Sequence, residues 1–426
     1  MNRLVATLAA TASVLAMAGA AHAQNLVISN ARIIVNANQI IEKGSLVVTD
    51  GKITKVGPGP AGPAPKGAKL INGAGMTVIA GYIDDHRHLV HGGRGPDGAA
   101  KWMKDDAARE MMELLESGVT TVQSGGDSPA VFDLRAKTAS GEIKGPRVLA
   151  SAQVPVSKMK DEATVRAAID KAIQQYKPDS IAEVHFPITE PPNKNVPGEQ
   201  ETKNLSAGID EAMKFNVPFQ VHTSAVSAQT AAIKAGAKKL VHTPHFGWMS
   251  DDEAKMVVAA HAWVSSCTGF GVPVFGVFNK DNKPTFRDGH PWPKEILDGE
   301  GNGREAGYKT VNGRTLFDNG VDYGYCTDTT YYAPAALAHE LKALNLVFSP
   351  LDMIKILGQN SADFIDRGKD LGTLEPGKLG DIVVLGGNPL DGYWNLLTAE
   401  VVIKGGVVMV DKRGKPNAGK PIVHHP

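Results

Sequence analysis

The stretch VIAGYIDDHRH, residues 78–88, decides how this chain folds. It opens as a β-branched apolar run, which is typical of a buried strand, and it closes on two histidines. Side chains alternate across a strand, so His86 and His88 are predicted to face the same side. Two neutral imidazoles at a strand end are natural ligands for zinc or a similar divalent ion. Whether this pair of histidines indicates a metal site depends on which residues end the other strands.

The region that follows alternates short apolar runs with segments of helical period. We predict strands near 79–84, 119–123, 147–151, 180–186, 218–222, 239–243, 263–267 and 322–327. We predict helices at about 100–117, 162–176, 205–215, 226–235, 250–261 and 334–346, with a further helix beginning at 349–350. Repeated units of this kind are typical of an α/β protein with a (β/α)8 TIM barrel, whose chemistry sits at the carboxyl ends of the strands.

The two ends of the mature chain have a different texture. Residues 24–77 and 367–426 consist of short β-branched runs that Gly and Pro turns interrupt. Neither segment alone is large enough to enclose a core. We therefore predict that they pair into one small β-sandwich beside a barrel of residues 78–366.

The first 23 residues have the pattern of a secretory signal peptide. A short cationic start precedes an apolar, Ala-rich run, and residues 21–23 supply a small-x-small cleavage site. An uncleaved membrane anchor is the alternative, which the shortness of the run disfavours. We expect cleavage after Ala23 and a secreted, periplasmic protein.

Composition excludes several classes of protein. Hydrophobic residues make up 42% of the 426 residues, and 45 basic residues balance 45 acidic ones. This composition excludes a disordered or collagen-like chain, and the balanced charge gives no footprint for nucleic acid. No later run reaches about 18 apolar residues, so we expect no membrane association once the signal is removed. A small-molecule substrate and a homo-oligomer are expected instead.

The only cysteines are Cys267 and Cys326, at the ends of two predicted neighbouring strands. A disulfide between them is geometrically conceivable. Two cysteines are too few for a disulfide scaffold, and a buried free cysteine behaves as a small apolar side chain. We expect two buried free thiols.

Single polar residues end three more of the predicted strands, and a fourth has two. The runs PFQVH (218–222), LVH (240–242) and YGYCTD (323–328) place His222, His242 and Asp328 on the inner side at the carboxyl end. The fourth strand, IAEVHF (181–186), directs Glu183 and His185 inward. The two oxygens of Glu183 could bridge two metal ions, with His185 as a lesser candidate and a structural ion pair as the alternative. Such a set at one barrel rim predicts a metal centre.

Two connections are longer than packing requires. Residues 187–204 are polar and Pro-rich, and residues 269–305 hold several aromatic side chains. We interpret the second as a substrate lid, with an oligomer contact as the alternative. His245, Tyr331, Tyr332 and Arg94 lie on or near loops above the predicted site, where a hydroxyl or guanidinium could bind a substrate carboxylate.

These motifs resemble the amidohydrolase superfamily, in particular its imidazolonepropionase and prolidase-like branch, which includes Xaa-Pro dipeptidases. The resemblance rests on GYIDDHRH at 81–88, on the single histidines that end strands five and six, on Thr327-Asp328, and on GTLEPGKLGDIVVL at 372–385. It covers nearly all of the mature chain.

The resemblance implies a ligand set. His86 and His88 would hold the more buried metal, His222 and His242 the second, and Asp328 would be both ligand and proton acceptor. Many relatives have a carbamylated Lys as the bridge on the fourth strand, which has no Lys here. Glu183 would replace it, or the site is mononuclear.

The predicted reaction is hydrolysis of an amide or peptide bond in a dipeptide, an N-acyl amino acid or a related amide. One or two divalent ions, with two zinc ions favoured, would lower the pKa of water from about 15.7 toward 7. Asp328 would take the proton and pass it to the leaving amine. The alternative is a mononuclear deaminase or cyclic-amide or lactone hydrolase that leaves His242 free for catalysis. A third reading, a binding protein without catalysis, would require a broken ligand set.

Overall fold

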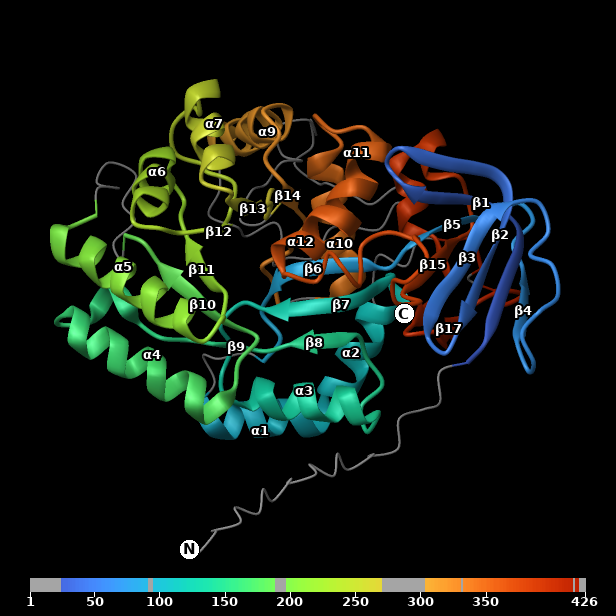
Figure 1. The fold of residues 1–426 in the computed structure, drawn as a ribbon, viewed down its shortest axis with the longest axis horizontal. Helices are drawn as coiled ribbons and strands as arrows, with labels where there is room; N and C mark the ends of the chain where they lie inside the picture. Colours follow the sequence, from blue (N-terminus) through green and yellow to red (C-terminus); the bar gives the residue numbers. More distant parts are fainter. Residues whose placement is uncertain are drawn as a thin grey trace, which may run out of the picture.

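The computed structural model describes residues 24–90, 95–187, 197–269, 303–330, 332–416 and 418–420. The predicted signal peptide and most of the two long connections lie outside the described residues. Eight strands from the two ends of the chain form one sheet in the order β17-β16-β15-β5-β1-β2-β3, with β4 beside β1 (Figure 1). They are β1 (Leu26–Asn36), β2 (Gln39–Thr49), β3 (Lys52–Pro58), β4 (Lys69–Asn72), β5 (Thr77–Ala80), β15 (Ile382–Leu385), β16 (Ala399–Lys404) and β17 (Val407–Asp411).

Strand β5 joins the two ends of the chain. It runs parallel to β1 and antiparallel to β15, with Val78 opposite Val384. The inner face of this terminal sheet has an apolar core of its own, which includes Ile28, Ile33 and Ile403. The terminal segments therefore meet in one hydrogen-bonded sheet.

The remaining strands are parallel and follow chain order in two sheets. One contains β6 (Tyr82–Arg87), β7 (Val119–Ser124) and β8 (Arg147–Leu149). The other contains β9 (Ser151–Ala152), β10 (Ser180–His185), β11 (Phe219–His222), β12 (Lys239–Val241), β13 (Trp263–Ser265) and β14 (Tyr323–Gly324). The sheets adjoin where β8 leads into β9, and Asp85 N donates to Tyr325 O just beyond β14. The arrangement is TIM-barrel-like.

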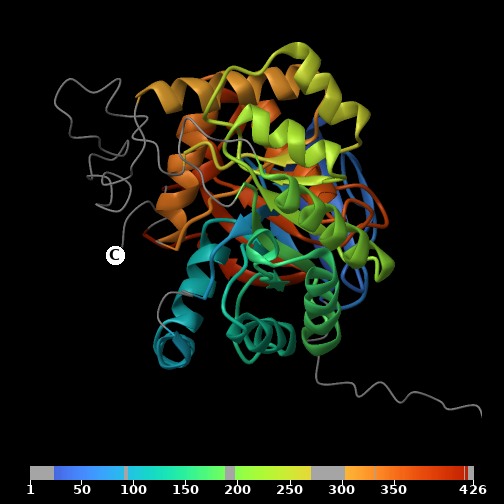
Figure 2. The ribbon, with the colours of Figure 1, turned by 90° about the vertical axis from the view of Figure 1, so that its left-hand side faces the viewer.

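Helices lie around the outside of these parallel strands (Figure 2). They are α1 (Gly95–Asp105), α2 (Ala107–Glu116), α3 (Ala130–Ser140), α4 (Glu162–Tyr176), α5 (Glu199–Lys214), α6 (Val226–Lys234), α7 (Asp251–Ala259), α9 (Gly303–Asp318), α10 (Ala333–Leu344) and α11 (Pro350–Lys355). The short helix α12 (Ser361–Phe364) instead shares a core with Ile83, Leu149 and Val241 of strands β6, β8 and β12. In the described part of the chain, no helix has both the length and the apolar character to cross a membrane.

The run predicted as a single strand at 79–84 is two strands that meet at Gly81. Residues before Gly81 belong to the terminal sheet as β5, and residues after it belong to β6. A Cβ at Gly81 would lie 2.2 Å from Thr120 Oγ1, so only glycine fits at this junction. From the sequence alone, an apolar run that is divided between two sheets cannot be distinguished from one continuous strand.

Several predicted helices have other bounds. The segment 100–117 is two helices, and α3 and α9 were not predicted at all. Helix α5 begins at Glu199, where Glu201 accepts a hydrogen bond from Gly198 N, so the connection predicted at 187–204 is shorter. Helix α3 has little amphipathic period, but Gly141 ends it with a left-handed φ of 82°.

The prediction of two free thiols was wrong, because Cys267 and Cys326 form a disulfide. Strands β13 and β14 pair in parallel with Ser265 opposite Gly324. Cys267 and Cys326 lie two residues after this pair, so the register brings them opposite each other, with their Cα atoms 5.0 Å apart.

Candidate metal centre

Two imidazoles and a carboxylate form the first half of the cluster. His86 lies in β6, His88 follows that strand directly, and Asp328 follows β14. Asp328 Oδ1 lies 3.2 Å from His88 Nε2 and 3.5 Å from His86 Nε2. His86 and Asp328 are buried, whereas His88 is partly exposed. The first strand and the last therefore direct these groups to one point.

The second half comes from three consecutive strands. Glu183 lies in β10, His222 ends β11, and His242 follows β12. His222 Nδ1 and His242 Nε2 lie 2.8 Å apart, and Glu183 Oε1 is paired with His222 and lies 3.6 Å from His242 Nε2. Three potential ligand atoms thus converge, all within 4.8 Å of one another.

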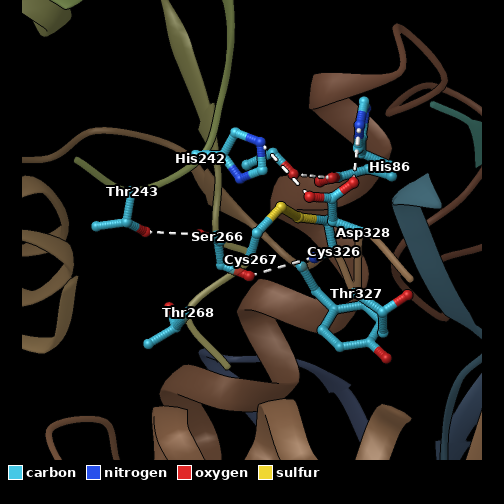
Figure 3. Close-up of a disulfide and its surroundings, with 12 residues drawn as sticks. His86, His242, Thr243, Ser266, Cys267, Thr268, Cys326, Thr327 and Asp328 are labelled. Atoms are coloured by element: carbon cyan, nitrogen blue, oxygen red, sulfur yellow. Dashed lines mark hydrogen bonds and ion pairs between the residues drawn. A yellow bond between two sulfur atoms is a disulfide. The ribbon is translucent and has the colours of Figure 1, made fainter. Parts of the chain in front are cut away.

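The two halves are in contact. His242 Nε2 lies 3.5 Å from Asp328 Oδ2 (Figure 3). Glu183 faces both halves, with Oε1 3.7 Å from His86 Nε2 and Oε2 3.8 Å from His88 Nε2. Glu183 Oε1 also lies near His222 and His242, so this carboxylate faces imidazoles of both halves, as a bridging carboxylate would.

Left-handed backbone occurs where the strands turn into the cluster. His242 has a φ of 77° and Asp328 a φ of 51°, and Cys267 between them in the fold has a φ of 42°. Such conformations cost non-glycine residues about 1–3 kcal/mol each and persist where the surroundings enforce them. The Cys267–Cys326 disulfide lies beside His242 and Asp328 and ties these strand ends together (Figure 3).

Two glycines that sequence reasoning missed pack against the cluster. A Cβ at Gly125 would lie 2.8 Å from His86 Nε2, and a Cβ at Gly126 would lie 2.6 Å from Glu183 N. Gly126 also has a left-handed φ of 91°. Consecutive glycines just after a predicted strand were the signal that could have identified this close approach.

Two further side chains, also missed, face the outer nitrogens of the histidines. The buried carboxylate of Asp127 accepts from Leu89 N at 3.0 and 3.1 Å, and its Oδ1 lies 3.7 Å from His88 Nδ1. Gln220 Oε1 lies 3.4 Å from His86 Nδ1. Groups at these positions orient metal-binding imidazoles and leave Nε2 for the ion.

The charges of the cluster suit a cation. Burial opposes ionisation of Asp328 and Glu183, but the imidazoles around them, His242 foremost at Asp328 and His222 at Glu183, hold the pKa of each carboxyl below its ordinary value. Burial, and then His222, lowers the pKa of His242 to about 4, which keeps this imidazole neutral. Among the described residues, the buried Nε2 of His86 has no hydrogen-bond partner. The neutral imidazole of His242, the two ionised carboxylates and the Nε2 of His86 together fit a divalent metal ion.

His185 lies at the exposed edge of the cluster and does not point fully inward as predicted. Its side chain is 49% exposed, and its ring stacks on that of His222 with centroids 4.2 Å apart. Its Nε2 lies 3.8 Å from Glu183 Oε2. His185 therefore borders the site on the solvent side.

The structure describes two of the four predicted substrate-binding residues. Tyr332 is buried at the start of α10, and the ring of His245 packs against Phe246 with centroids 4.4 Å apart. Arg94 and Tyr331 lie outside the described residues. The structure brings the predicted metal ligands together.

TIM-barrel-like strands with imidazoles and carboxylates gathered at their carboxyl ends define a class of metal-binding hydrolases. Residues 77–417 match the model of the Amidohydrolase family, and the chain belongs to that family. It is therefore a hydrolase that acts on carbon–nitrogen bonds.

Curated relatives and solved structures agree with this assignment. The imidazolonepropionase of Phocaeicola vulgatus is 22% identical over 90% of this chain and 99% of its own length, and that of Thermoanaerobacter pseudethanolicus is 22% identical over 81% and 84%. A Xaa-Pro dipeptidase with bound methionine has a TM-score of 0.71 at 18% identity and covers 90% of this chain and 99% of its own. The ochratoxinase of A. niger gives the same score and identity over 94% and 99%.

Proposed function

We propose that this protein is a dinuclear, metal-dependent hydrolase that cleaves an amide or peptide bond in a dipeptide, an N-acyl amino acid or a related amide. The observation that carries the proposal is the convergence of two three-residue groups, each able to hold an ion, with Glu183 of one group facing His86 and His88 of the other. His86, His88 and Asp328 would hold one ion, and Glu183, His222 and His242 would hold the other. Zinc suits this mixture of imidazole and carboxylate ligands.

The residues of the cluster have different roles in the proposed hydrolysis. Divalent ions held there would supply a water of lowered pKa and polarise the scissile carbonyl. Asp328 accepts the proton of the attacking water and donates it to the leaving amine. The carboxyl group begins ionised, because the neighbouring imidazoles hold its pKa below the ordinary value. Asp127 and Gln220 keep the imidazoles of His88 and His86 in the ligating orientation.

The proposal extends to the architecture and location of the protein. We propose that the parallel strands close into a complete barrel, because backbone hydrogen bonds join β6 to the segment after β14. We also propose export to the periplasm with removal of residues 1–23. An oxidising compartment is where a disulfide such as Cys267–Cys326 persists, which supports this location.

Elemental analysis and a substrate panel test the function together. Mature protein should contain about two equivalents of zinc or a similar ion and should hydrolyse members of a panel of N-acyl amino acids, dipeptides, cyclic amides and lactones. Exhaustive chelation should abolish turnover, and zinc should restore it. Full turnover after complete removal of metal would overturn the proposal. One ion per chain, with cyclic amides as the best substrates, would favour the mononuclear alternative.

A further inference from the structure

A large open groove adjoins the metal cluster on the side of His88. Its volume is about 1420 Å³, and His88 and Asp127 line it together with α1, α3 and Tyr176 at the end of α4. Pockets for drug-sized ligands usually enclose about 300–1,000 Å³. The groove therefore has more room than a small dipeptide would fill.

The lining is mostly apolar, with aromatic rings on one side. Met103 and Ile143 contribute apolar surface, and Phe132 and Tyr176 stack with ring centroids 4.8 Å apart and an interplanar angle of 7°. Arg135 lies 5.3 Å from the centroid of the Phe132 ring. Such a stacked pair is a rigid platform against which an aromatic or bulky aliphatic group can pack.

Two lysines, Lys104 and Lys137, and three carboxylates, Asp127, Asp133 and Glu142, line the groove. Lys137 pairs with Glu142, whereas none of the described carboxylates forms an ion pair with Lys104. Lys104 is thus the cation of the groove that remains available to a ligand. A carboxylate on the bound molecule is the complementary group.

We propose that this groove binds the bulky apolar part of the substrate, and that the substrate is an amide with a large aromatic or aliphatic group and a carboxylate that pairs with Lys104. The inference rests on the proposed function, because His88 belongs both to the groove and to the metal cluster. The scissile bond lies at the His88 end, and the bulky group extends between α1 and α3. Short dipeptides would leave most of the groove filled with water.

A groove-blocking variant tests the apolar contact. Ala100 is exposed and lines the groove from α1, so Ala100→Trp should narrow it without disturbing the core. Ala136→Trp, on the exposed face of α3 outside the groove, is the matched control. Ala100→Trp should raise KM for N-(1-naphthylacetyl)-alanine about tenfold and leave KM for N-acetylalanine unchanged. In Ala136→Trp, KM for each of the two substrates should equal that of the unchanged protein.

A charge variant tests the second contact. Lys104→Ala should raise KM for naphthylacetyl-alanine roughly three- to tenfold and should leave KM for the corresponding alanine amide unchanged, since a partly exposed ion pair contributes modestly. Lys104→Arg should restore most of the loss. In all variants kcat should change little, because these residues do not contact the reacting atoms.

Binding of a product to the groove can be measured even if the protein hydrolyses none of the substrates. In calorimetric titrations, the product 1-naphthylacetate should bind the unchanged protein and Ala136→Trp equally, and Ala100→Trp about tenfold more weakly. Equal binding by all three proteins, or no binding at all, would overturn the groove proposal. Hydrolysis of N-acetylalanine together with an unchanged KM for N-(1-naphthylacetyl)-alanine in Ala100→Trp would also overturn it but leave the proposed function standing. The expected binding pattern without hydrolysis of any substrate would refute the function and not the groove.

Discussion

Two buried clusters of acids lie close together in this fold, and they are satisfied in opposite ways. In the inner network, Asp84 accepts from Thr327 N at 3.1 Å and from its hydroxyl at 2.7 Å. Glu340 accepts from Ser266 Oγ at 2.8 Å and from Thr268 N at 2.7 Å. At the rim, Asp328 and Glu183 instead face imidazoles that face one another.

The difference shows what distinguishes a structural cluster from a functional one. Burial raises the pKa of Asp84 to about 6 and that of Glu340 to about 7, while protein donors compensate in part. The rim carboxylates have pKa values held below the ordinary range by neighbouring imidazoles. Protein donors satisfy the inner acids, whereas the rim acids and imidazoles need a cation.

The largest effect should follow from exchanging Asp328. Asp328→Asn keeps the shape of the side chain but removes the proton acceptor, so kcat should fall by about 10³- to 10⁴-fold. Steady-state kinetics on the best panel substrate measures this change. Asp84→Asn is the matched variant from the inner network, and it should lower the melting temperature more than it lowers kcat. If Asp328→Asn retained a tenth of the original kcat, the contrast between the two clusters would be lost.

The next effect concerns the bridge. Glu183→Ala should reduce the metal content from about two ions per chain to about one, because the Glu183 carboxylate faces both halves of the cluster. Mass spectrometry of the metals in dialysed protein gives the ratio. Glu183→Asp, which keeps the charge at a shorter reach, should retain more metal than the alanine variant. Two ions in Glu183→Ala would show that Glu183 does not bridge.

The sequence predicted the metal-binding side chains better than the groups that hold them in place, for a physical reason. Alternation along a strand determines the side to which His86 and His88 point, and the same rule applies to His222 at the end of β11. Asp127 comes after two glycines beyond the strand, where that periodicity no longer holds. The Cys267–Cys326 pair depends on the register between β13 and β14, which separate stretches of sequence do not contain.

The disulfide lies between the two clusters, and its removal should have an intermediate effect on stability. Cys267 and Cys326 are 59 residues apart, and closing a loop of that length stabilises a fold by about 2–4 kcal/mol. The double variant Cys267→Ser/Cys326→Ser should lose this amount of unfolding free energy in denaturant titrations. A phosphine reductant should destabilise the unchanged protein similarly and leave the double variant unaffected. Two reactive thiols in the untreated protein would contradict the disulfide.

The smallest effect is the pH dependence that Glu340 contributes. Burial raises its pKa from an ordinary value of 4.5 to about 7, so the folded protein binds a proton more tightly than the unfolded chain. Stability from this group is full below about pH 4.5 and is lost as the pH rises through 7, by at most about 3 kcal/mol. Melting temperatures between pH 5 and 8 should therefore decline, and Glu340→Gln should flatten this part of the decline. An identical slope in the variant would mean that Glu340 stays ionised in the fold, as the rim carboxylates do, and the contrast between the clusters would then rest on their partners alone.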